Sequence, residues 1–362
     1  MCGIESTMIE IDGSYREGGG QILRTSLGLS CLFRKPFRIY NIRKARKKPG
    51  LMPQHLTAVR AAQLVSGAEV KGADTGSTEL VFSPGAVRGG EFFFDIGTAG
   101  STSLVLQTLI PALAFIGNES SSTAPGRHGI SLKGGTHVPF SPSYNYLAEV
   151  FVPLLQRVGL DVRISIESYG FYPKGGGKIR AEILPVKETK SIHATERGDL
   201  LRLRVISGVG NLPVTIAERQ RQALLDEIHS GIKILPRVET EILPVRTPGQ
   251  GTFVFLGSEA ANSVAGFASL GERGKRAEAV GQEAAREFLG YYASGAALDH
   301  HIPDQIVLYL ALARGESVFT TYRITEHLMT NLWVISLFHE YRYSVEGDVG
   351  RPGLVRINPV VA

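Results

Sequence analysis

An alternation of helices and strands that recurs three times along the chain constrains its fold more than any other feature. In the first copy, apolar spacing predicts helices at residues 21–33 and 53–65 and strands at residues 36–42 and within 68–82. The same order of helix, strand, helix, strand, strand returns in residues 101–186 and again in residues 303–357. Self-similarity at this level predicts a molecule built from three similar units.

The spacing of the copies locates an insertion. The first helices of copies one and two begin 80 residues apart, at 21 and 101, whereas those of copies two and three begin 202 residues apart, at 101 and 303. The excess of about 100 residues is the size of a small domain. It contains strand patterns at 201–207, 233–243 and 252–257 and helix patterns at 216–232 and 277–289. We therefore expect an α/β (α+β) protein whose core comprises residues 1–186 and 287–362, with a small α/β domain inserted at residues 187–286.

Composition excludes several other classes. With 43% hydrophobic and 20% charged residues the chain has enough apolar side chain for a core and is not predicted to be disordered. Its longest apolar stretch, residues 104–116, is too short for a membrane span and contains Pro111. The two cysteines, Cys2 and Cys31, form no disulfide framework, and no secretory signal is visible, so a cytoplasmic location is expected. A net charge of +5 permits a polyanionic partner without requiring one.

Three glycines, residues 18–20, stand between Glu17 and Gln21 at the start of the first helix. Backbone N–H groups at a helix N-terminus can hold an anion, and Arg24 lies one turn further on. A plain turn and helix cap is the alternative. The run matches neither the dinucleotide fingerprint nor the Walker pattern, which argues against a conventional P-loop.

Five cations fill the six positions of residues 43–48, just before the second helix. On charge alone the segment is a solvated basic loop. Gln54 and His55 follow at the start of a helix, however, where the helix dipole favours anions. In that context contact with phosphate is the better hypothesis. A second glycine run, residues 175–177, predicts close approach of the backbone, with a bulged hairpin as the alternative.

His327 follows Thr325, a good N-cap, and lies in the first turn of an apolar helix. A histidine here often has only a structural role. The positive end of the helix dipole, however, disfavours the imidazolium and preserves a nucleophilic lone pair. His55 holds the equivalent place in the first copy, and Asp304 and Gln305 begin a neighbouring helix where they could hold a base or ribose. His300 and His301 lack a third ligand at zinc spacing.

Six motifs in order resemble the RNA 3′-terminal phosphate cyclase family over nearly the whole chain. They are DGSYREGGGQILR (12–24), IRKARKKPGLMPQHL (42–56), IGTAGSTSLVLQT (96–108), GFYPKGGG (170–177), PDQ (303–305) and EHLMTN (326–331). The resemblance implies a core of three helix-helix-sheet repeats like the C-terminal domain of initiation factor 3, with a small inserted α/β domain. It also implies ATP-dependent conversion of an RNA 3′-phosphate to a 2′,3′-cyclic phosphate, with Mg²⁺ or Mn²⁺, through a histidine–AMP and an RNA(3′)pp(5′)A intermediate.

Carried over residue by residue, the resemblance makes His327 the nucleophile. It implies that ATP contacts the residues that match the family's adenosine segment and its neighbours: Gln107, His301, Ile302, Pro303, Asp304, Gln305 and Phe267. It implies that the substrate phosphate contacts Arg24, Arg43, Arg46, Gln54 and His55, and that Glu17 faces the metal. The chain departs from the family pattern at His301, where relatives can carry Tyr, and at Tyr169, where they usually carry Arg or His.

Two other readings compete. An inert cyclase-like factor that binds ribosomal RNA would lack the nucleophile, so His327 together with Thr330 and Asn331 favours an enzyme. An enolpyruvyl transferase would share the repeat fold without needing a histidine at this helix start. The predicted partner is RNA with a 3′-terminal phosphate, and no membrane is expected. The sequence leaves the oligomeric state open, with a homodimer as one arrangement.

Overall fold

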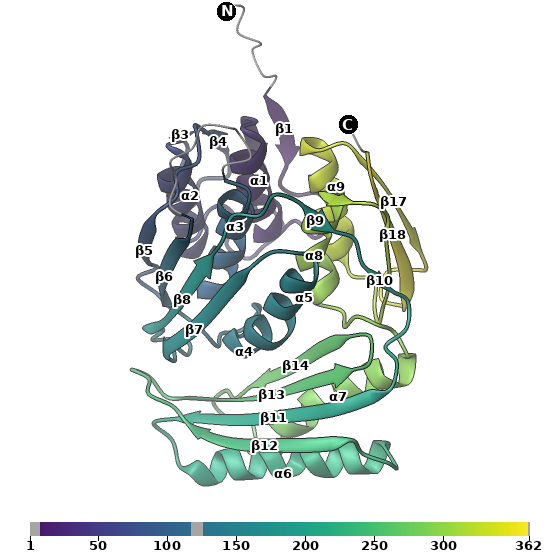
Figure 1. Ribbon diagram of the computed structural model, residues 1–362. Coiled ribbons are helices and arrows are strands. Elements are labelled where there is room, and N and C mark those ends of the chain that lie inside the picture. Colours follow the sequence, from purple (N-terminus) through teal and green to yellow (C-terminus); the bar gives the residue numbers. More distant parts are fainter. Residues whose placement is uncertain (1–7, 117–125, 361–362) are drawn as a thin grey trace, which may run out of the picture.

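The computed structural model describes residues 8–116 and 126–360, and it has a mixed α/β architecture with four-stranded mixed sheets packed against helices (Figure 1). Three of these sheets share one strand order. The first is β1 (Ile9–Asp12), β2 (Phe37–Tyr40), β4 (Leu80–Ser83), β3 (Glu69–Lys71); the second is β5 (Glu91–Asp95), β6 (His128–Gly134), β8 (Gly177–Ile183), β7 (Val162–Ser168); the third is β10 (His193–Ala194), β16 (Ser317–Thr321), β18 (Gly353–Pro359), β17 (Tyr341–Glu346). In each sheet the first two strands are parallel and the other pairs are antiparallel.

Two helical segments accompany each of these sheets. They are α1 (Gly20–Phe33) and α2 (Pro53–Ser66), then α3 (Thr102–Ala114) and the continuous segment α4 (Tyr144–Tyr146), η1 (Leu147–Phe151) and α5 (Val152–Arg157), then α8 (Ile302–Ala311) and α9 (Glu326–Phe338). Helices α1, α3, α8 and α9 pack on one another between the sheets (Figure 1). Their apolar faces, including Leu23, Leu27 and Ile306, are fully buried, so this helix layer is the centre of the core.

All of the expected core helices are present, but the repeats begin earlier than expected. A strand precedes the first helix of each copy and pairs in parallel with the strand that follows that helix. These first strands, β1, β5 and β10, are two to five residues long and lie at sheet edges with few buried positions. They therefore carry little of the alternating pattern that identifies a strand. Two further strands, β9 (Thr189–Lys190) and β15 (Ala313–Arg314), form a small parallel pair.

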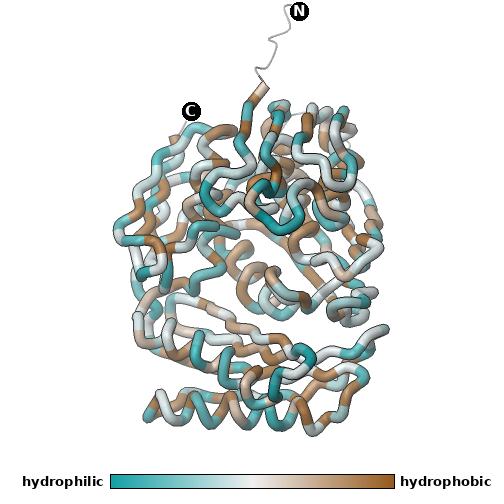
Figure 2. Tube along the Cα trace, turned by 180° about the vertical axis from the view of Figure 1, so that it is seen from behind, coloured by the Kyte–Doolittle hydropathy of each residue, from teal (hydrophilic) through white to brown (hydrophobic). Residues whose placement is uncertain are grey.

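A fourth sheet, in the order β12-β11-β13-β14, forms a separate layer at the bottom of Figure 1. Its elements are β11 (Leu200–Gly210), α6 (Val214–Gly231), β12 (Arg237–Pro244), β13 (Gly251–Ala260), β14 (Val264–Leu270) and α7 (Ala277–Ser294), which we call the insert. Helices α6 and α7 pack on the sheet around a hydrophobic cluster of their own, whereas β14 contacts η1 of the core. Figure 2 shows α6 at the lower edge alternating hydrophilic and hydrophobic residues, as expected of a helix with one face on a sheet.

The division of the chain into core and insert stays a proposal, and these elements adjust its ends. β10 at residues 193–194 pairs with β16 of the third sheet, and α7 continues past residue 286 to Ser294. We therefore put the ends of the insert nearer Asp199 and Gly295 than residues 187 and 286. No helix within the described residues is both long and apolar enough to cross a membrane.

Candidate active site

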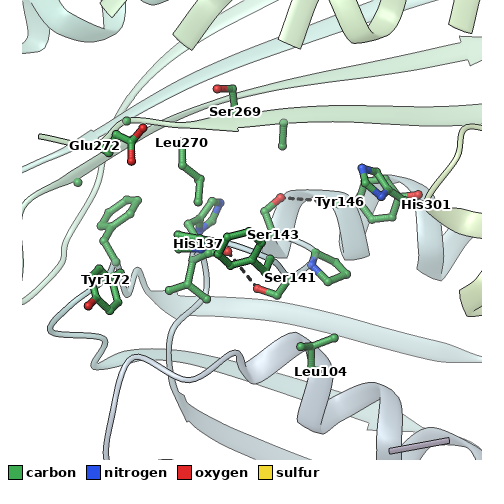
Figure 3. A pocket seen from close by; sticks show the side chains of 18 of the residues that line it. Leu104, His137, Ser141, Ser143, Tyr146, Tyr172, Ser269, Leu270, Glu272 and His301 are labelled. Atoms are coloured by element: carbon green, nitrogen blue, oxygen red, sulfur yellow. Dashed lines mark hydrogen bonds between the residues drawn. The ribbon is translucent and has the colours of Figure 1, made fainter. Parts of the chain in front are cut away.

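A cavity of about 1820 Å³ lies between the core and the insert. Leu104 of α3 and Ser141 line one side, and Ser269, Leu270 and Glu272 at the end of β14 line the other (Figure 3). Cavities that bind small molecules usually enclose about 300–1,000 Å³. This cavity therefore has room for more than one small ligand, and His327 is among its lining residues.

The first turns of four helices meet at the His327 end of the cavity. The Nδ1 of His327 in α9 lies 2.6 Å from the Oε1 of Gln21 in α1, and the Nε2 of Gln21 donates to the Oδ2 of Asp304 in α8 at 2.7 Å. A Cβ on Gly20 would fall 2.3 Å from the ring of His55, in the first turn of α2. Each N-terminus carries unpaired N–H groups and partial positive charge, so this place attracts anions.

The two hydrogen bonds of Gln21 determine the tautomer of His327. Because the amide N–H of Gln21 donates to Asp304, its oxygen faces His327 and accepts the Nδ1–H. The lone pair is therefore on Nε2. Burial and the neighbouring Arg24, Arg46 and His301 lower the pKa of His327, which keeps the ring neutral at pH 7. A neutral imidazole with a free Nε2 lone pair is the form that acts as a nucleophile.

His55 has the opposite tautomer. Its Nδ1 accepts a hydrogen bond of 3.1 Å from the backbone N–H of Met52, so the proton is on Nε2. Burial, Arg24 and Arg43 lower its pKa to about 3, and the ring stays neutral. His55 thus offers an N–H donor where His327 offers a lone pair. The two equivalent histidines fit different tasks, binding an oxyanion and attacking a phosphorus.

Cations and the carboxylates of Glu17 and Asp304 surround this place. Arg24 is half-buried between His55 and Asp304, and desolvation lowers its pKa to about 10. Arg46 forms an ion pair with Glu17, whose Oε2 lies 3.9 Å from His327 Nδ1 and accepts the N–H of Gly19. The structure therefore brings together Glu17, Arg24, Arg46, His55 and His327 as the sequence predicts, while their roles remain to be tested.

Two of the predicted phosphate residues already have structural partners. The Nη1 of Arg43 donates to the carbonyls of Lys48 and Gly50, each at 2.9 Å, and so holds the basic loop closed. The Oε1 of Gln54 accepts the N–H of Ser101 at 3.0 Å and joins the start of α2 to the start of α3. These contacts leave their other N–H groups for a ligand.

The residues predicted to contact ATP lie mostly along the cavity. Gln107 donates to Gln305 at 2.6 Å, Gln305 donates to the carbonyl of His301 at 2.8 Å, and the exposed His301 ring lies edge-on to Tyr146 (Figure 3). Ile302 and Pro303 are buried in the first turn of α8. Asp304 is half-buried and lines the cavity, desolvation raises its pKa to about 7, and it accepts the amide N–H of Gln21.

Phe267 does not belong to this set. Its side chain has no exposed surface and packs against Phe288 and Tyr291 inside the insert. A ring with no free face cannot stack on a base, so the expectation for Phe267 is wrong. Strand alternation explains the error, because Gly266 and Ala268 line the cavity and Phe267 points to the other face of the sheet.

The second glycine run packs on protein. A Cβ on Gly175 would fall 2.8 Å from the backbone of Ala99, and one on Gly176 would fall 2.9 Å from Pro248 of the insert. The backbone of this glycine run therefore closely approaches other parts of the protein, namely the backbone of Ala99 and the side chain of Pro248. Tyr169, before this run, donates its N–H to Arg246 and stacks on His137, and burial raises its pKa to about 12.

Sequence reasoning missed Asp299. Its carboxylate is fully buried and accepts the N–H groups of His301 and Ile302 at the start of α8, the hydroxyl of Tyr146 and the N–H of Gly266 in β14. It therefore joins the helix that carries Asp304 and Gln305 to both the core and the insert. An aspartate three residues before the first residue of a helix was the available signal.

The donors present fit a divalent cation only together with a substrate. Among the residues that the structure describes, no three His, Cys, Asp or Glu side chains are grouped to hold a metal. Mg²⁺ is usually bound by one or two carboxylates plus substrate phosphates. Glu17, a single carboxylate beside an anion site, fits that pattern.

Comparisons with known proteins agree with the motifs. A model of the family described as RNA 3′-terminal phosphate cyclase matches residues 15–345. Proteins with that name are 44% identical in Ignicoccus hospitalis, over 98% of this chain and 99% of the relative, and 42% identical in Methanopyrus kandleri, over 98% and 99%. A third, from Sulfolobus acidocaldarius, is 45% identical over 97% of this chain and 100% of the relative.

Among solved structures, the enolpyruvyl transferase NikO from Streptomyces tendae covers 48% of this chain and 33% of its own, with 19% identity and a TM-score of 0.25, a likeness too low to support an argument. The family model and the full-length relatives carry the conclusion instead. Because both span almost all of the sequence, the chain belongs to the RNA 3′-terminal phosphate cyclase family of enzymes.

Proposed function

We propose that this protein converts the 3′-terminal phosphate of RNA to a 2′,3′-cyclic phosphate with ATP as co-substrate, and that His327 is its nucleophile. The single observation that carries the proposal is the hydrogen bond from His327 Nδ1 to Gln21, which leaves Nε2 free at the meeting point of four helix N-termini. The core would then be three repeats of the type found in the C-terminal domain of initiation factor 3. Cytoplasmic location and oligomeric state stay predictions.

The proposed reaction has three steps. First, His327 Nε2 attacks the α-phosphorus of ATP, a P–N bond forms and pyrophosphate leaves. Second, an oxygen of the RNA 3′-phosphate attacks the same phosphorus, the P–N bond breaks, and AMP passes to the RNA as RNA(3′)pp(5′)A. Third, the neighbouring 2′-hydroxyl attacks the 3′-phosphorus, loses its proton to the medium and expels AMP. The products are the cyclic phosphate, AMP and pyrophosphate.

The residues of this chain have distinct tasks in that scheme. Arg24 and the Nε2–H of His55 would hold phosphate oxygens, and Arg46 would neutralise charge on the transferred group. Gln107, His301 and Gln305 would hold the adenosine end of ATP along the cavity. Glu17 would hold a Mg²⁺ or Mn²⁺ ion, which when bound would neutralise negative charge on phosphate oxygens and make the phosphorus under attack more electrophilic.

The test is capture of AMP. Purified protein is incubated with ATP labelled at the α-phosphate and Mg²⁺ or Mn²⁺, denatured, separated on a gel and then exposed to acid. We expect a protein-bound label that acid removes and alkali does not, and that is absent from His327→Ala. Folded, ATP-binding protein without any label would favour an RNA-binding role without catalysis.

A further inference from the structure

Tyr15 and Trp333 form an aromatic pair that the proposed reaction does not use. Their ring centroids are 4.1 Å apart with 30° between the planes, so the rings are stacked. Trp333 is partly buried against the core, whereas Tyr15 keeps 39% of its surface exposed. The tyrosine ring is thus held in place by one stacking partner while it still offers surface to a second.

The pair lies close to the nucleophile. Tyr15, Arg16 and Glu17 are consecutive in the loop before α1, and each contacts a residue of α9. Glu17 reaches His327, Arg16 Nη1 pairs with Glu326 Oε2 at 3.1 Å, and Tyr15 stacks on Trp333. Trp333 follows His327 by six residues, which places it about 9 Å further along the helix and about 120° around it. Tyr15 lies two residues before Glu17, whose carboxylate reaches His327, so it is the loop that connects the Tyr15 ring to a phosphate held at His327.

The surroundings are cationic. The Arg16 guanidinium carbon lies 5.8 Å from the Tyr15 ring centre, and Arg46 Nη2 donates to the carbonyl of Glu17 at 3.3 Å. The loop that carries Arg46 also exposes Lys44, Lys47 and Lys48. Exposed aromatic rings beside a basic groove are how proteins bind single-stranded nucleic acid, because bases stack on the rings and cations follow the backbone.

We propose that Tyr15, supported by Trp333, stacks on the nucleobase of the 3′-terminal nucleotide of the RNA. The inference rests on the proposed function, which brings the terminal phosphate of that nucleotide to His327. Every base has a π face, so the contact tolerates any terminal base. A terminal base in a single strand is free to turn onto the ring, whereas the last base of a duplex is held by its pairing partner and its stacked neighbour. The preferred substrate class is therefore RNA with a single-stranded 3′ end.

A binding experiment tests the platform without any catalysis. Trp333 is the only tryptophan of the chain, so its emission reports on this place alone. The protein is titrated, without ATP, with a short oligoribonucleotide that ends in a 3′-phosphate and with the same oligonucleotide lacking its terminal base. We expect quenching by the first, and an affinity about 5- to 150-fold lower for the second, the range of one stacked base.

Variants separate stacking from folding. Tyr15→Ala should lower the affinity for the complete oligonucleotide to that for the abasic one and leave the abasic affinity unchanged, while Tyr15→Phe, which keeps the ring, should bind like the wild type. Tyr343→Ala, which removes an equally exposed ring from β17, is the matched control and should change neither. Equal wild-type affinities for the two oligonucleotides, or equal loss of both in Tyr15→Ala, would overturn the proposal.

The outcome is independent of AMP capture. If base-dependent binding is found but no label is transferred from ATP, the platform stands and the proposed function fails. If AMP capture is found but the terminal base adds nothing to binding, the proposed function stands and the platform fails.

Discussion

Gln21 is the residue on which the proposed chemistry of His327 depends. One side-chain amide accepts from His327 and donates to Asp304, so its orientation fixes which imidazole nitrogen is free. Catalytic histidines are generally held in one tautomer by such a partner, commonly a carboxylate. Here the Asp304 carboxylate does not contact His327 directly. It orients the amide of Gln21, and that amide holds the imidazole in one tautomer.

Replacing Gln21 with Leu should remove this control. We expect the single-turnover rate of AMP capture to fall by about 100-fold or more, because the ring is then free to rotate and to carry its proton on Nε2. The measurement is label transfer from ATP at saturating concentration. Gln222→Leu, an exposed glutamine on α6, is the control and should keep the wild-type rate. An unchanged rate in Gln21→Leu would refute this role.

The pH dependence of AMP capture should report Asp304. Burial raises its pKa to about 7, partly opposed by Gln21 and Arg24 and supported by Asp299. As the pH falls through 7 the acid becomes neutral and can donate to Gln21, which then turns its N–H toward His327 and moves the ring proton to Nε2. The pKa of His327 itself is lowered below its usual 6.5, so its own protonation comes at lower pH.

We therefore expect the rate to decline below about pH 7 in the wild type. In Asp304→Asn the side chain cannot titrate, and the decline should begin only at the lower pKa of His327. Single-turnover rates across this range check the expectation. Superimposable profiles for the two proteins would show that Asp304 does not govern the tautomer.

At the scale of elements, the glycine run before α1 makes room for side chains. A Cβ on Gly20 would lie 2.3 Å from His55 Nε2 and 2.9 Å from Arg24 Nη1. Since Gly20 is the first residue of α1, alanine suits its backbone and should not weaken the helix. We expect Gly20→Ala to stay folded and to lose use of RNA 3′-phosphate by about tenfold or more, a cost of at least ~1.4 kcal/mol.

Turnover with 3′-phosphate RNA, together with a melting curve, checks this expectation. Gly126→Ala is a matched control because a Cβ there meets no atom of the described residues within 4 Å. Wild-type turnover of Gly20→Ala would mean that His55 and Arg24 need not hold their present positions.

The basic loop and the glycine loop are joined by the Arg46–Glu17 ion pair, which occupies the carboxylate that we assign to the metal. Arg46→Gln should free Glu17 and tighten Mn²⁺ binding by up to about fivefold, the range for a partly exposed ion pair. Electron paramagnetic resonance of free Mn²⁺ measures the affinity without turnover. Arg38→Gln, which breaks a pair with Glu79 on the first sheet, should leave it unchanged. Weaker binding in Arg46→Gln would argue against Glu17 as the metal residue.

The elements show which parts of the fold a sequence can predict. Helix α2, predicted at residues 53–65, matches its apolar spacing within one residue at each end, because long amphipathic segments average over many positions. The sequence analysis missed strand β14 because its small residues do not give the pattern of a strand. The residues are small because the strand packs directly on the core. A Cβ on Gly266 would fall 2.7 Å from Val150 and 3.0 Å from Tyr146, a tertiary reason that no local pattern contains.

The same limit applies to the site. His327, Arg24 and Glu17 could be proposed as site residues from the sequence because helix starts and motifs mark them locally. The partnership of Gln21 with Asp304 joins residues 283 positions apart, and Asp299 connects three segments distant in sequence. Such contacts follow from packing rather than from local propensity. The expectation for Phe267 was wrong for a local reason. Side chains alternate along β14, so Phe267 points into the insert while its neighbours line the cavity.

At the scale of the molecule, the insert is joined to the core where the cavity begins. Besides Asp299, Arg204 of β11 pairs with Glu149 of η1 at 2.9 Å, and burial raises the pKa of Glu149. Segment η1 is a π-helical turn, a feature that is frequent at functional sites. The insert thus closes one side of the cavity and also supports the start of α8, so its stability and that of the core should be coupled.

Tyr146→Phe tests this coupling. It removes the hydroxyl that donates to Asp299, and a hydrogen bond to a charged group contributes about 1.5–3 kcal/mol to the free energy of unfolding. Urea unfolding can be followed by Trp333 emission, which reports on the core, and by circular dichroism, which reports on the whole chain. If core and insert form one cooperative unit, both transitions should move together to lower urea. A circular dichroism transition that moves while the Trp333 transition stays would show that the insert unfolds on its own, and the start of α8 would then be held by the core alone.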